Sequence, residues 1–119
     1  MAAVAAELRM RLWAMDAHVP DAAVLTDRDG LRETLHAAAR VGGARVLGEE
    51  FCVFGNGAVT GVLVLAQSHL SVHTWPELLL ANVDLLSYGD MPGEEVLRCV
   101  ERRLGADRAE VTCVRRAPW

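Results

Sequence analysis

Apolar residues recur along this chain with two different spacings, and the longer spacing, of three to four residues, predicts two helices. The first helix follows an acidic cap at Asp27 or Asp29 and ends at Gly42 and Gly43, because glycine readily adopts the backbone conformation that closes a helix. The second helix begins after Pro92. The apolar stripes are Leu31, Leu35 and Ala38 in the first helix and Val96, Val100 and Leu104 in the second. Each helix therefore presents one apolar face to a core.

The other apolar runs are short and predict six strands. They cover residues 9–15, 44–54, 59–66, 70–75, 79–86 and 109–115. Residues 55–57, Gly-Asn-Gly, predict a turn after the second run, and Pro76 separates the fourth run from the fifth. The order is a strand, a helix, four strands, a helix and a last strand. We therefore expect an α+β fold, a two-layer sandwich of a largely antiparallel sheet with two helices on one face.

The third predicted strand indicates that the sheet is covered on both faces. Residues 59–66, VTGVLVLA, carry apolar side chains on both sides of an extended chain. With 119 residues the chain forms one domain, 1–119, with a modest core and no third layer of its own. We therefore expect a homodimer that stacks two sheets through their open faces into four layers, αββα.

The composition is that of a soluble globular domain, with 52% hydrophobic and 24% charged residues. The net charge of -4 and the scattered basic residues argue against nucleic-acid binding. Cys52, Cys99 and Cys113 are odd in number and form no CxxC pair, so we expect reduced thiols in the cytoplasm and neither disulfides nor a zinc site. The uncharged stretch 51–76 is too rich in polar side chains for a membrane span, and the Ala-rich start lacks the apolar core of a signal peptide.

A dense polar segment follows the third predicted strand. Residues 67–77 read QSHLSVHTWPE, directly after the apolar run GAVTGVLVLA at 57–66. Polar side chains beside a core are costly unless each finds a partner, so this cluster indicates a site of chemistry.

This segment resembles the self-cleavage and active-site segment of the S-adenosylmethionine decarboxylases of the small bacterial and archaeal type, with the match strongest from Phe54 to Gly89. The resemblance implies cleavage between Gln67 and Ser68 into a β chain, 1–67, and an α chain, 68–119. It also implies that Ser68 becomes a pyruvoyl group, which forms a Schiff base with the substrate amine in polyamine biosynthesis. No metal and no pyridoxal phosphate are then required.

The resemblance also assigns roles to neighbouring residues. His73 is the base for self-processing, and the Thr60 hydroxyl stands where the family has a serine that assists it. Glu77 matches the glutamate that holds the ribose hydroxyls of the substrate, and Phe54 lies where an aromatic ring stacks on the adenine. Gln67 replaces a common glutamate, but only its backbone carbonyl reacts.

Two departures leave the substrate open. Tyr88 stands where the family has the cysteine that returns a proton to the substrate carbon, and phenols are weaker acids than thiols. Leu78–Leu80 replace aromatic and small residues. L-Ornithine or L-arginine are therefore alternative substrates, whose distal cation requires a carboxylate such as Glu77, Asp84 or Asp16. A homologue that never cleaves and serves as a binding or regulatory subunit is a further alternative.

Three other interpretations of this segment are weaker. A hydrolase triad of Ser68, His73 and Asp84 lacks the GxSxG turn. His69 and His73 have the spacing of a helical metal pair, but in a strand they stand about 13 Å apart. Trp75, taken alone, is typical of a core residue.

Overall fold

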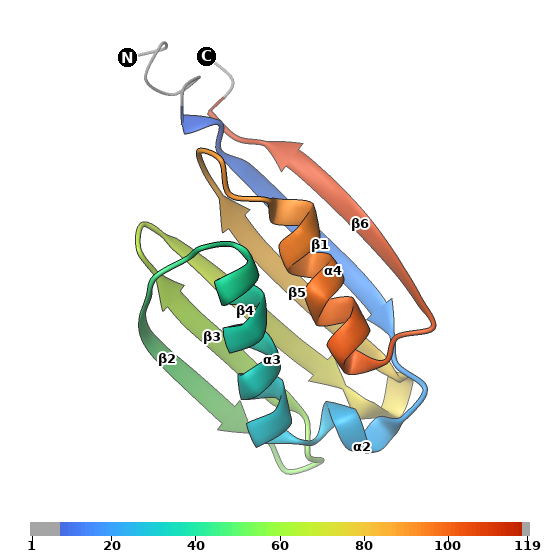
Figure 1. Ribbon diagram of the computed structural model, residues 1–119. Helices are drawn as coiled ribbons and strands as arrows, with labels where there is room; N and C mark the ends of the chain where they lie inside the picture. Colours follow the sequence, from blue (N-terminus) through green and yellow to red (C-terminus); the bar gives the residue numbers. More distant parts are fainter. Residues whose placement is uncertain (1–7, 118–119) are drawn as a thin grey trace.

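A computed structural model describes residues 8–117, and the Ala-rich start lies outside the described residues. Within them the chain forms six strands, three α-helices and one short 3-10 helix (Figure 1). The strands are β1 (Arg11–His18), β2 (Val46–Val53), β3 (Val59–Leu65), β4 (Ser68–Trp75), β5 (Leu80–Ser87) and β6 (Arg108–Arg115). The helices are α2 (Ala22–Leu25), α3 (Arg28–Val41), η1 (Pro76–Leu78) and α4 (Gly93–Leu104). Among these residues no helix has the length and apolar character needed to cross a bilayer.

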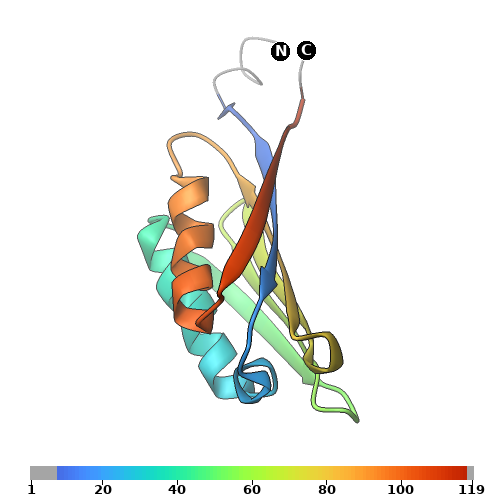
Figure 2. The same ribbon diagram turned by 90° about the vertical axis from the view of Figure 1, so that its right-hand side faces the viewer.

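The six strands form one sheet in the order β2-β3-β4-β5-β1-β6, with every neighbouring pair antiparallel. Helices α3 and α4 lie side by side on one face, and the other face is open (Figure 2). The predicted α+β sandwich with two helices on one face of a largely antiparallel sheet is therefore confirmed. The dimer stays a prediction.

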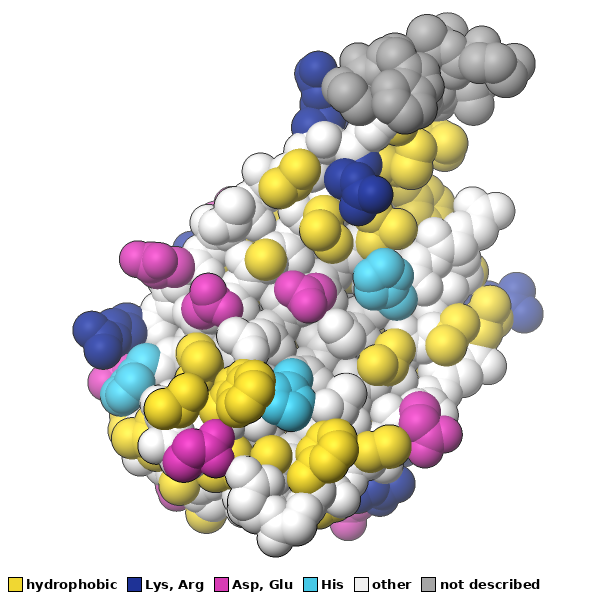
Figure 3. All heavy atoms as spheres, turned by 180° about the vertical axis from the view of Figure 1, so that it is seen from behind, with side chains coloured by type: hydrophobic (Ala, Val, Ile, Leu, Met, Phe, Trp, Pro, Cys, Tyr) yellow, Lys and Arg dark blue, Asp and Glu magenta, His cyan; other side chains and the backbone are white. Residues whose placement is uncertain are grey.

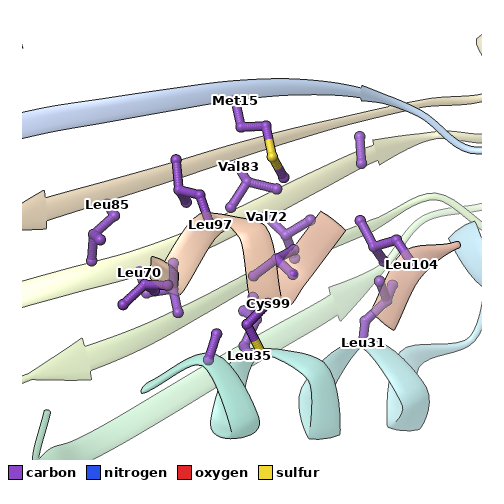
Figure 4. Packing of buried hydrophobic residues seen from close by; sticks show 14 of the residues in the cluster. Met15, Leu31, Leu35, Leu70, Val72, Val83, Leu85, Leu97, Cys99 and Leu104 are labelled. Carbon is purple, nitrogen blue, oxygen red and sulfur yellow. The ribbon is translucent and has the colours of Figure 1, made fainter. Parts of the chain in front are cut away.

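The core lies between the helices and the covered face of the sheet (Figure 4). Alternate residues of β4 point into it, and the burial of Leu70 and Val72 shows this alternation. Thr74 is the polar member of this row. Its hydroxyl accepts from the Val59 backbone N–H at 2.9 Å and donates to the Leu25 carbonyl at 2.7 Å, so its burial is compensated.

Most element boundaries agree with the prediction to within two or three residues. Asp27, rather than Asp29, caps α3, because its side chain accepts from the Gly30 N–H at 3.0 Å. The sequence pattern missed α2 because four residues are too few to show a helical period. The strand expected at 70–75 begins earlier, at Ser68, so the proposed cleavage position is part of the sheet.

A surface ion-pair cluster joins α3 to β2. Glu49 binds Arg32, with Nη2 to Oε1 at 3.0 Å, and His36, with Nε2 to Oε1 at 2.9 Å. The hydrogen bond from Arg32, followed by that from His36, holds the pKa of Glu49 below its ordinary value of 4.5. A carboxylate with a lowered pKa stabilises the folded state at neutral pH, and this stability is lost as pH falls through the folded-state pKa.

We therefore expect Glu49→Gln to lower the melting temperature at pH 7 by a few degrees, since the pair is partly exposed. The difference from the parent should shrink as pH falls below about 4. Thermal melts at pH 7 and pH 3 measure this. Glu50→Gln, which changes the adjacent residue on the other side of β2, is the matched control. A difference that stayed constant across this range would contradict the ion-pair account.

Candidate functional site

The open face of the sheet carries much of the polar segment identified in the sequence (Figure 3). Because Leu70, Val72 and Thr74 point to the helices, the residues between them point to the open face. On β4 these are His69, Ser71, His73 and Trp75. The strand alternation therefore gathers two histidines, a serine and a tryptophan on a surface that the protomer leaves uncovered.

His73 lies at the centre of a small cluster at one end of this face. It pairs with Thr60 across β3 and β4, and the Thr60 hydroxyl is 2.7 Å from His73 Nδ1. The ring of Trp75 packs edge-on against His73 with centroids 4.5 Å apart, and that of Phe54 does so at 6.1 Å. Trp75 is 40% exposed and Phe54 49%, so Trp75 is not a core residue of the protomer. The expected positions of Phe54, Thr60 and His73 thus come together.

A chain of hydrogen bonds extends this cluster across the sheet. Trp75 Nε1 donates to Asn82 Oδ1 at 2.6 Å, and Asn82 Nδ2 donates to Asp16 Oδ1 at 2.9 Å. Sequence reasoning missed Asn82, because only the strand register places it opposite His73 on one side and Asp16 on the other. The sequence suggested the Asp16 carboxylate as a partner for a substrate cation, and in the structure one of its oxygens already accepts a hydrogen bond from Asn82.

Glu77 lies beside the same end of the sheet. It belongs to η1, immediately after β4, and its Oε2 accepts from Asn56 Nδ2 at 2.9 Å. Asn56 belongs to the loop between β2 and β3, as does Phe54. The bond therefore ties the expected ribose-binding carboxylate to the loop that carries the expected adenine-stacking ring.

Ser68 lies at the opposite end of β4. Leu65 pairs with Ser68, so Ala66 and Gln67 form a two-residue turn, and Gln67 adopts a left-handed backbone with φ of 58°. The Ser68 hydroxyl donates to the backbone carbonyl of Leu86 on β5. By the alternation of β4 the Ser68 side chain is on the same side as Leu70, and this bond ties it to β5 next to the peptide bond that the resemblance predicts to be cut.

The structure does not bring Ser68 and His73 together within one chain. They are five positions apart on an extended strand, a distance of about 16 Å. Asp84 pairs with Ser71 at mid-strand and is exposed. A Ser68–His73–Asp84 triad is therefore absent from the described protomer. Since His69 and His73 are also on a strand, they do not form a helical metal pair, and residues 8–117 contain no cluster of three or more metal-ligating side chains.

The unusual Leu78–Leu80 stretch borders a hollow of about 550 Å³. Asp16 and His18 line it from β1, and Arg108 and Glu110 line it from β6. His18 Nδ1 is 2.7 Å from Asp107 Oδ1, and the hydrogen bond from His18 is the main cause that lowers the pKa of Asp107. Leu78, Leu79 and Leu80 thus line a hollow that lies just beyond Glu77 in the chain.

An antiparallel sheet with helices on one face, and a paired threonine and histidine on the other, defines the class of this protein as an α+β sandwich. A family model described as S-adenosylmethionine decarboxylase matches residues 11–117. The chain belongs to this family.

The chain matches known proteins over different shares of their length. The chain is 37% identical over 83 residues to an S-adenosylmethionine decarboxylase proenzyme of Pseudomonas paraeruginosa, matching 69% of this chain but 52% of that protein. The chain thus spans about half the length of this relative. A Methanococcus maripaludis proenzyme is 32% identical over 90% of this chain and 84% of its own. The crystal structure of the Aquifex aeolicus adenosylmethionine decarboxylase superposes with a TM-score of 0.82 at 28% identity, covering 92% of both chains.

Proposed function

We propose that this protein is a self-processing S-adenosylmethionine decarboxylase of polyamine biosynthesis, whose pyruvoyl group is made from Ser68. The observation that carries the proposal is the turn at Ala66–Gln67. There a serine hydroxyl, bound to the Leu86 carbonyl, directly follows a left-handed residue at the start of a strand. A tight turn of this kind favours attack of the hydroxyl on the preceding carbonyl, because it limits the motion of the two groups. The curated relatives bear the word proenzyme in their names, which supports a chain that matures by cleavage.

The chemistry begins with an acyl shift. The Ser68 hydroxyl attacks the Gln67 carbonyl carbon and gives up its proton. The Gln67–Ser68 carbon–nitrogen bond breaks, and the nitrogen takes a proton, which leaves an ester and a free amine. A base then removes the Ser68 α proton, and the ester carboxylate departs as the new end of the β chain. The elimination leaves a double bond between Cα and Cβ of residue 68, which makes this residue a dehydroalanine. Water hydrolyses its imine form to the pyruvoyl ketone and ammonia, so water is the only added reactant.

A single protomer does not place His73, the proposed base, close enough to remove the Ser68 α proton. His73 is about 16 Å from Ser68 along β4, and the Thr60–His73 pair faces the open side of the sheet. We propose a homodimer that stacks the two open faces. A two-fold axis through these faces brings the Thr60–His73 end of one protomer against the Ser68 end of its partner. The uncovered aromatic and aliphatic side chains, Phe54, Val64 and Trp75, support burial of this face.

The residues around the site fit the pyruvoyl group and its substrate. When formed, the pyruvoyl ketone supplies an electron-accepting carbonyl for the loss of carbon dioxide. Phe54 offers a ring to an adenine, and Glu77 offers a carboxylate to ribose hydroxyls. Tyr88 occupies the position of the family's proton-donating cysteine. A phenol is a weaker acid than a thiol, and the Tyr88 hydroxyl already donates to the Ala66 carbonyl at 2.9 Å. The proton that returns to the substrate therefore comes from water rather than from Tyr88.

The substrate is tested by measuring carbon dioxide release from S-adenosylmethionine, L-ornithine and L-arginine side by side with fully cleaved protein. We expect release from S-adenosylmethionine to exceed that from either amino acid by at least about 100-fold, because only the first engages both an aromatic ring and a ribose-binding carboxylate. Faster release from ornithine or arginine would reassign the substrate to a basic amino acid. Background release from all three would remove the decarboxylase assignment.

A further inference from the structure

We propose that Tyr88 is a positioning residue for self-cleavage, which holds the turn before Ser68 by a hydrogen bond to the Ala66 carbonyl. The inference rests on the proposed self-processing of Ser68. It assigns to Tyr88 a task that differs from proton donation during decarboxylation.

The contacts of the turn point to this role. The Tyr88 hydroxyl donates to the Ala66 carbonyl at 2.9 Å. The Ala66 N–H donates to the Arg45 carbonyl at 2.9 Å, so both polar groups of the Ala66 backbone are held. Two residues before Tyr88, the Leu86 carbonyl accepts from the Ser68 hydroxyl. Residues at and just after the end of β5 therefore form hydrogen bonds to the residue before Gln67 and to the residue after it.

Tyr88 is itself well anchored. It follows β5 directly, it is partly buried, and its own carbonyl accepts from the Met91 N–H at 3.3 Å. An anchored ring can fix a turn whose central residue, Gln67, has the left-handed backbone that side chains other than glycine rarely adopt. Without the hydroxyl, the turn is free to relax and to move the Gln67 carbonyl away from the Ser68 oxygen. The acyl shift is the step that depends on this distance.

The test measures ester formation separately from the later steps. In a His73→Ala background we expect the ester to form, but its elimination is blocked because the proposed base is missing. Hydroxylamine splits esters far faster than amides, so it cuts the chain wherever the ester has formed. We expect Tyr88→Phe in this background to slow hydroxylamine scission about tenfold, the value of one lost hydrogen bond. In the parent background Tyr88→Phe should slow self-cleavage by a similar factor, followed by intact mass. Carbon dioxide release per cleaved chain should stay within about twofold of the parent.

Ser87→Ala is the matched control, because it removes the neighbouring bond from Trp13 Nε1 at 2.9 Å without touching the turn. It should leave scission unchanged, and matching thermal melts of all variants exclude a general loss of stability. Scission of the Tyr88→Phe chain at the parent rate overturns the proposal. Normal cleavage with a large loss of turnover per cleaved chain also overturns it and identifies a proton donor. A parent chain that never cleaves refutes the proposed function instead.

Discussion

Replacing Ser68 by alanine is expected to leave the chain at its full mass after prolonged incubation and to reduce carbon dioxide release to background, at least about 10⁴-fold below the parent. The substitution removes the nucleophile of the acyl shift and the only source of the ketone at the same time. Fold and stability should be retained, because Ser68 contributes one hydrogen bond, to the Leu86 carbonyl at the end of a strand. Intact-mass analysis measures whether the chain is cleaved. Edman degradation then shows whether the α chain has a free amino end, because a pyruvoyl group blocks sequencing.

Ser71→Ala is the matched control for this experiment. Ser71 is on the same strand, on the open face opposite Asp84, and has no part in the proposed chemistry. It should cleave at the 67–68 bond and turn over like the parent. A Ser68→Ala chain that still releases carbon dioxide would exclude the pyruvoyl mechanism altogether. Cleavage at another bond would move the precursor to a different residue.

The sequence predicted the fold well where side-chain periodicity is strong. The stripe through Leu31 and Leu35 defined α3, and the stripe through Val96 and Val100 defined α4, because a helix buries every third or fourth residue. The short run at 70–75 correctly predicted a strand, and this excluded the helical histidine pair. Each of these inferences needs only neighbours along the chain.

What the sequence could not predict depends on strand register. Spacing along the chain gives no sign that Asn82 stands between Trp75 and Asp16, because the three belong to different strands. The same holds for Tyr88 and Ala66, which are 22 residues apart. The resemblance names His73 as the processing base for Ser68, and the two residues are five positions apart in the chain. In an extended strand that separation is about 16 Å, and only the structure shows that the whole segment is extended.

Because Ser68 and His73 are so far apart in one chain, we expect two variants that cannot cleave alone to restore self-cleavage when they are co-expressed. Ser68→Ala lacks the nucleophile and His73→Ala lacks the base, so each expressed alone should stay uncleaved. When they are co-expressed, a mixed dimer presents the intact Ser68 of the His73→Ala chain to the intact His73 of the Ser68→Ala chain. We expect cleavage of the His73→Ala chain only, in about a quarter of all chains, because random assortment puts about half of the dimers in the mixed form.

The two chains differ in mass, so intact-mass analysis shows which of them is cut. The control is co-expression of His73→Ala with the double variant Ser68→Ala/His73→Ala, which forms the same mixed dimers without any base and should remain whole. Mixed dimers that form but stay uncut would show that His73 acts within its own chain or has no part in processing. Cleavage restricted to the His73→Ala chain is the outcome expected from the proposed dimer. Within one chain the proposed nucleophile and the proposed base lie at opposite ends of β4, about 16 Å apart, and a second copy turned end over end would bring them together.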